Sequence, residues 1–216
     1  MKKFIISTVF GLGMVVTASV NAAAVSFDFA AIADGDSSYG VPGGEKGAAS
    51  FTFTKNGISV TATGFKTGDP STPYFAYLDS GTAGLGVCKS LTGSQQCTPA
   101  GDDNVTFEES LKLVFDKEVT ITETTFLNGG HVSNFASNVF DLSIDGGAAT
   151  TIALANIVST QFTGTEFIFS NPNNGQSNAK QFYISNLDVA PVPVPAAVWL
   201  FGTGLLGLVR FTRKTA

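Results

Sequence analysis

The chain has 216 residues, a formal net charge of −5, two cysteines and one histidine. Of its 12 Lys and Arg residues, five lie at the two ends, which leaves seven against 17 Asp and Glu in the body and a net charge of −10 there. An acidic body excludes nucleic-acid binding as a function, because that function needs a basic surface.

The amino end has the three parts of a secretory signal peptide. Lys2 and Lys3 are basic, residues 4–16 are apolar, and small residues follow at 17–24. The pattern predicts that residues 1–22 form a signal helix that is removed during export. Cleavage after Ala22 and cleavage after Ala24 both fit the small-residue pattern.

The body alternates apolar and polar residues with the two-residue period of half-buried strands. The first such stretch is 26–29. Asn56-Gly57 separates two more, at 50–54 and 58–62, and is a strong hairpin signal. Asp145-Gly146-Gly147 likewise predicts a hairpin between strands at 140–144 and 151–154.

A third hairpin is predicted at 116–118, between strands at 111–115 and 119–122, because this charged triplet interrupts the apolar alternation. Polar stretches at 33–47, 64–73 and 170–179 are predicted to be loops. About ten short strands separated by turn residues predict an all-β fold, specifically an antiparallel, jelly-roll-like β-sandwich over residues 25–190.

Cys88 and Cys97 are the two cysteines. In an exported chain an even number of cysteines predicts a disulfide, and two reduced thiols are the alternative. One histidine is too few for a zinc site with these cysteines, and a bridged cysteine is no nucleophile.

The densest polar segment, at 101–109, holds four carboxylates. The first interpretation is a solvated acidic loop that leads into a strand. The alternative is a calcium site with Asp102, Asp103 and Glu109 as ligands, because hard cations are bound by several oxygen atoms. The segment lacks the spacing of an EF-hand loop.

No arrangement of residues predicts catalysis. The chain has no Gly-x-Ser-x-Gly elbow, and His131 follows Asn128-Gly129-Gly130, where a histidine is typical of a turn. The protein is therefore predicted not to be an enzyme.

The carboxyl end, 191–216, has three parts. A Pro/Val stretch is followed by a charge-free apolar segment at 196–209 and then by cations. As a helix the apolar segment is roughly 20 Å long, short against the roughly 30 Å hydrocarbon core of a bilayer. Trp199 near one end and the cations at the other still favour a membrane helix. The cations are Arg210, Arg213 and Lys214.

This tail resembles the PEP-CTERM sorting signal, and most closely its variant VPLPAAVWLFGSGLLGL. Val194 stands between Pro193 and Pro195, where the named motif has Glu and the variant does not. The resemblance implies that an integral membrane protease of the exosortase type recognises the Pro-x-Pro motif and removes the tail. It also implies a Gram-negative host that makes exopolysaccharide.

These observations predict a non-enzymatic surface or extracellular-matrix protein. The precursor would be exported and held transiently in the inner membrane, then processed by the exosortase-like partner and placed at the cell surface or outside the cell. The alternative is a calcium-assisted carbohydrate-binding module that acts on exopolysaccharide. No other cofactor is expected.

Overall fold

The computed structural model describes residues 23–175 and 177–193. Within them the chain is mostly strand, so the predicted all-β class is confirmed. The helices are α1 (Phe29–Ala33) and the 3-10 helix η1 (Asn178–Lys180). The strands are β1 (Val25–Asp28), β2 (Lys46–Ala48), β3 (Phe51–Lys55), β4 (Ile58–Lys66), β5 (Asp69–Asp79), β6 (Gly84–Cys88), β7 (Glu109–Asn128), β8 (Val139–Ile144), β9 (Thr150–Ala153), β10 (Ile157–Val158), β11 (Phe162–Ser170) and β12 (Phe182–Pro191).

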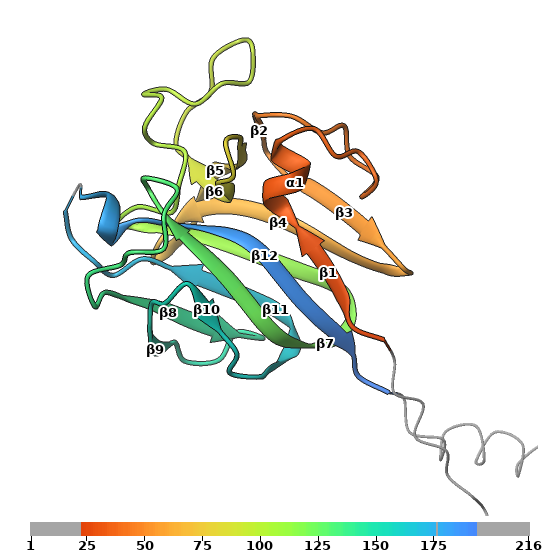
Figure 1. Cartoon of the computed structure of the whole chain (residues 1–216). Helices are drawn as coiled ribbons and strands as arrows, with labels where there is room; N and C mark the ends of the chain where they lie inside the picture. Colours follow the sequence, from red (N-terminus) through yellow and green to blue (C-terminus); the bar gives the residue numbers. More distant parts are fainter. Residues whose placement is uncertain (1–22, 176, 194–216) are drawn as a thin grey trace, which may run out of the picture. The chain divides into compact units, whose positions relative to one another are not determined.

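All these strands belong to one hydrogen-bonded sheet, in which every pairing is antiparallel. The long strand β7 is its centre (Figure 1). Its first half pairs with β4 and β11, and its second half pairs with β12. The series β7, β4, β5, β6, β12 then returns to β7, so the pairings close into a ring.

The predicted hairpin at 116–118 is wrong, because β7 runs through these residues without a turn. All three side chains are exposed, and the register with β11 shifts where Glu166 pairs with Val114 and Gly164 with Val119. The charged triplet therefore marks an irregularity within one strand. Short hairpin loops usually place a Gly at a position of positive φ, and the triplet contains no Gly.

The predicted loop at 64–73 is also wrong. β4 continues to Lys66, Gly68 turns the chain with φ of 78°, and β5 begins at Asp69. Pro70 and Pro73 are tolerated because this part of β5 pairs on one side only, with β4, and a missing N–H on the other side breaks no ladder.

The two glycine-containing hairpins are confirmed. Asn56 and Gly57 have φ of 49° and 75° between β3 and β4, as the twist-matched hairpin turn requires. Asp145 and Gly146 adopt similar values between β8 and β9. The first strand spans Val25–Asp28 and not the predicted 26–29, because the Asp28 side chain accepts the Ala31 N–H at 2.9 Å and so caps α1.

The buried side chains form one large apolar cluster with many phenylalanines. Phe126 lies in its centre and contacts the rings of Phe140, Phe169 and Phe182 at centroid distances of 4.9, 6.2 and 5.5 Å. These four rings come from β7, β8, β11 and β12, so the core joins strands that are far apart in the sequence. Burial of such rings is the main stabilising term of the fold.

The described body begins and ends in neighbouring strands. β1 and β12 pair with Val25 opposite Val189, and after the sheet ends at Pro191 the Val192 N–H still donates to the Glu118 carbonyl. Among the described residues no helix is long and apolar enough to cross a membrane. The predicted signal peptide (1–22) and membrane segment (196–209) lie outside those residues.

Candidate functional site

Two of the three predicted calcium ligands contact a lysine instead. The Lys89 ammonium lies 3.1 Å from Asp102 Oδ1 and 2.7 Å from Glu109 Oε1. Glu109 is fully buried, and its other oxygen accepts the Thr106 N–H at 2.7 Å. The lysine therefore occupies the position that a cation would take between Asp102 and Glu109.

Asp103, the third predicted ligand, lies in a different environment. It accepts the Tyr183 hydroxyl at 2.6 Å and an N–H of Asn104 at 3.4 Å. The backbone of this loop packs so closely on Gly86 of β6 that a Cβ at that position would overlap it. The described residues contain no group of three or more His, Cys, Asp or Glu side chains arranged to hold a metal ion, so the geometry does not support the calcium prediction.

The pKa of the buried Glu109 lies well above the ordinary value for a glutamate. Burial raises the pKa of Glu109 to about 7, although hydrogen bonds from Lys89 and Thr106 act in the opposite direction. Burial acts to lower the pKa of Lys89, but Glu109 and Asp102 outweigh it and raise that pKa. The pair is therefore ionic above about pH 7, and Glu109 takes up a proton below it.

The predicted disulfide between Cys88 and Cys97 is confirmed, with an S–S distance of 2.00 Å. Both residues are buried, and they pack with Tyr77 and the partly buried Leu91 in a small cluster of their own. Because Lys89 directly follows Cys88, the bridge also fixes the start of the segment that carries the lysine to Glu109.

A polar network that the sequence did not predict surrounds His131. Its Nε2 lies 2.9 Å from Asp79 Oδ2, and its Nδ1 lies 2.9 Å from the Gly81 carbonyl. Because a carbonyl only accepts, Nδ1 carries a hydrogen. Asp79 is 7% exposed, and burial, with a contribution from the charge of Asp103, raises its pKa to about 6. The rings of His131 and Tyr183 pack in a T-shaped arrangement, with their centroids 5.5 Å apart.

The network joins two turns and does not form a nucleophilic centre. The Ser80 hydroxyl donates to Glu45 at 2.6 Å, and the Tyr183 hydroxyl donates to Asp103. The His131 ring nitrogens contact a carboxylate and a carbonyl, and neither contacts a hydroxyl or a thiol. The position of His131 in a turn was predicted and is confirmed by its φ of 58°, but only tertiary structure brings Asp79 to it.

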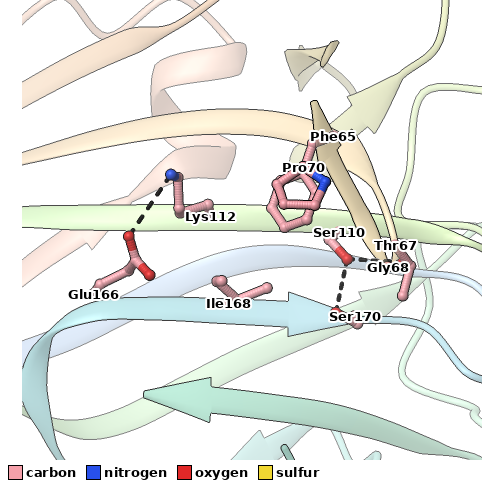
Figure 2. Close-up of a pocket in the computed structure, with 9 residues that line it drawn as sticks. All are labelled: Phe65, Thr67, Gly68, Pro70, Ser110, Lys112, Glu166, Ile168 and Ser170. Carbon is pink, nitrogen blue, oxygen red and sulfur yellow. Dashed lines mark hydrogen bonds and ion pairs between the residues drawn. The ribbon is translucent and has the colours of Figure 1, made fainter. Parts of the chain in front are cut away.

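A groove of about 430 Å³ lies on the outer face of the sheet, over β4, β7 and β11 (Figure 2). Its lining combines apolar and hydroxyl-bearing side chains with one ion pair. The lining residues are Phe65, Thr67, Gly68, Pro70, Ser110, Lys112, Glu166, Ile168 and Ser170. A second hollow of about 290 Å³ shares Phe65, Pro70 and Lys112 with it and extends past Pro73 and Tyr74.

The polar groups of the groove are bonded to one another. The hydroxyls of Thr67, Ser110 and Ser170 form a chain with O···O distances of 2.8 and 2.7 Å. Lys112 Nζ lies 3.7 Å from Glu166 Oε2, and both side chains are about one-third exposed. Figure 2 shows the ion pair at one end of the groove and the hydroxyl chain at the other.

Comparison with protein-family models, with curated proteins and with solved structures found no match to this chain. The residues expected to direct sorting lie at the edge of the described body or beyond it. Pro193 is exposed and is the last described residue. Val194, Pro195, Trp199, Arg210, Arg213 and Lys214 lie outside the described residues.

Proposed function

We propose that this protein is a non-enzymatic, exported surface or matrix protein whose tail is removed by an exosortase-like membrane protease. The observation that carries the proposal is the tail at 191–216, which resembles the PEP-CTERM sorting signal. The pairing of β1 with β12, with Val25 opposite Val189, is compatible with it. The polypeptide enters and leaves the folded body at one place. Segments attached at both ends can therefore be engaged and cut while the core stays folded.

The disulfide supports the export part of the proposal. Bridges of this kind persist in the periplasm and outside the cell, whereas cytosolic reductants keep most thiols reduced. Cys88 and Cys97 are both buried, and no free cysteine accompanies them among the described residues. We propose that the precursor is anchored in the inner membrane and that the processed product lies at the surface or outside the cell.

We further propose that the sheet is a β-sandwich of jelly-roll type. β7 supports this architecture, because its two halves pair with different strands, β4 in the first half and β12 in the second. One core cluster receives side chains from both sets of strands, as two facing layers would require.

The processing step is tested by expressing the full chain with and without an exosortase-type protease and measuring the intact mass of the product. We expect loss of the tail only when the protease is present and only when Pro193 and Pro195 are intact. Pro42→Ala changes an exposed proline of the body and serves as the matched control. An identical carboxyl end in all samples would refute the processing proposal.

A second candidate function, carbohydrate binding, is favoured by the groove over β4, β7 and β11. The calcium-assisted form of this function has no geometric support, because Lys89 lies between Asp102 and Glu109. We therefore propose that exopolysaccharide binds in the groove without the help of calcium.

A further inference from the structure

The groove lies on a sheet face whose backbone is already fully engaged. β7 is paired with β4 on one side and β11 on the other, and β11 is in turn paired with β8. An extended peptide binds a sheet by adding to a free edge, where N–H and C=O groups have no partner. The free edge that borders the groove is the start of β5, where Pro70 and Pro73 lack the N–H that such pairing uses, so the ligand of the groove must be held by side chains.

The hydroxyl chain can both donate and accept hydrogen bonds. Three hydroxyls, those of Thr67, Ser110 and Ser170, share two hydrogen bonds, in which either atom can donate. One hydrogen therefore remains free at one end of the chain, and lone pairs remain at the other. Because the direction of the chain can reverse as a unit, it suits a ligand whose own groups are also hydroxyls.

The rest of the lining is apolar or charge-balanced. Phe65, Pro70 and Ile168 present carbon surface, which fits the C–H faces of a sugar ring. Lys112 and Glu166 lie 3.7 Å apart and neutralise each other, so no unpaired cation attracts phosphate or carboxylate groups. The net charge of −10 on the body adds repulsion of polyanions.

We infer that this groove binds a neutral glycan chain, with the hydroxyl chain facing sugar hydroxyls and Phe65, Pro70 and Ile168 facing ring C–H groups. The shared residues Phe65, Pro70 and Lys112 connect the groove to the second hollow, so the glycan can extend past Tyr74. The inference rests on the second candidate function, carbohydrate binding, and is independent of the sorting proposal.

The test is affinity electrophoresis of the full chain in a polyoxyethylene detergent. Native gels contain a neutral polysaccharide (dextran, galactomannan or hydroxyethylcellulose) or, in parallel, polygalacturonate or polyphosphate. Ser170→Ala removes one end of the hydroxyl chain. Thr163→Ala is the matched control, because Thr163 bonds to Thr120 across the same two strands at 2.8 Å but lies outside the groove.

We expect at least one neutral polysaccharide to retard the protein, and Ser170→Ala to weaken that retardation about two- to tenfold, as loss of one hydrogen bond implies. Thr163→Ala should leave it unchanged, and the two variants should have similar thermal unfolding midpoints, because each loses one hydroxyl–hydroxyl hydrogen bond between β7 and β11. Retardation that is equal in all three proteins would place glycan binding elsewhere and overturn the groove assignment. Stronger retardation by polygalacturonate would overturn the neutral-glycan inference and leave carbohydrate binding standing. Absence of retardation by every polysaccharide, or stronger retardation by polyphosphate, would overturn the inference and the second candidate function together.

Discussion

Replacing Lys89 with methionine isolates the role of the ion pair at the start of β7. The substitution keeps the length and apolar character of the side-chain stem but removes the ammonium that lies 2.7 Å from the fully buried Glu109. A buried carboxylate that loses its partner destabilises a protein by about 3–5 kcal/mol. Because the Lys89 side chain is 42% exposed, we expect the lower end, about 3 kcal/mol, at pH 9.

The expected effect depends on pH in a defined direction. Burial raises the pKa of Glu109 from 4.5 to about 7, so in the folded protein the group is protonated at pH 5. At pH 5 Glu109 is therefore uncharged in the variant and needs no partner. We expect the variant to lose less than about 1 kcal/mol of stability at this pH, from the weaker contact between Lys89 and Asp102. Above pH 7 the wild-type carboxylate is ionised, whereas in the variant it stays protonated to higher pH. The variant then loses about 1.4 kcal/mol per pH unit relative to wild type until its own pKa is reached.

Urea unfolding followed by circular dichroism at pH 5, 7 and 9 measures this difference. Lys117→Met is the control, because Lys117 and Asp116 form an exposed pair whose loss should change stability by less than about 0.5 kcal/mol at every pH. The double variant Lys89→Met/Glu109→Gln should recover most of the loss at pH 9. A loss for Lys89→Met that does not change with pH would refute the assignment of Glu109 as a buried group with a raised pKa.

Three further predictions use other parts of the body. Replacing Cys88 and Cys97 together by alanine should lower the free energy of unfolding by about 2–3 kcal/mol, because the bridge closes a short loop in the unfolded chain. Added reductant should lower the melting temperature of the wild type but not that of the variant. Because the pKa of Asp79 is raised above its ordinary value of 3.8 to about 6, the native state binds the extra proton and loses stability as the pH rises from 4 to 6. The stability of Asp79→Asn relative to wild type should therefore increase across that interval and stay constant above it, whereas a constant difference throughout would contradict the burial argument. Gly86→Ala should destabilise the protein by about 1–3 kcal/mol, because the added Cβ would overlap fixed backbone. Gly93→Ala is the control: its Cβ would lie in open space, so its effect should be neutral or stabilising by up to about 1 kcal/mol. Equal melting temperatures for the two variants would count against the close packing at Gly86.

Local signals predicted the parts of the fold that depend on neighbouring residues. Asn56-Gly57 and Asp145-Gly146 specify hairpins because positive φ is needed at the turn itself, and both adopt it. The disulfide was predictable from the even number of cysteines together with the expected export of the chain. The incorrect turn at 116–118 arose where charged residues lie on a strand whose partners are distant in sequence. The incorrect loop at 64–73 arose where prolines lie on the one-sided start of β5.

The candidate site could be predicted only in part. Asp102, Asp103 and Glu109 were recognised as a carboxylate-rich segment, but their direction depends on Lys89 and Tyr183, which lie outside that segment. Nothing in the local sequence marks Lys89 as the partner of Glu109. Whether these carboxylates bind a metal ion or pair with Lys89 depends on contacts between segments that are apart in the sequence. The composition of the segment alone therefore does not distinguish a metal site from an ion pair.

The sequence by itself determined the strand-rich class, two hairpins, the disulfide and the acidic character of the body, because each depends on periodicity, turn chemistry or residue counts. The tertiary structure alone decided the continuity of β7, the contact of His131 with Asp79, and the groove that joins Phe65 to Ser110 and Ser170. These features depend on which strands become neighbours. That choice is made by burial of side chains such as Phe126 against residues more than forty positions away, and no local pattern records it.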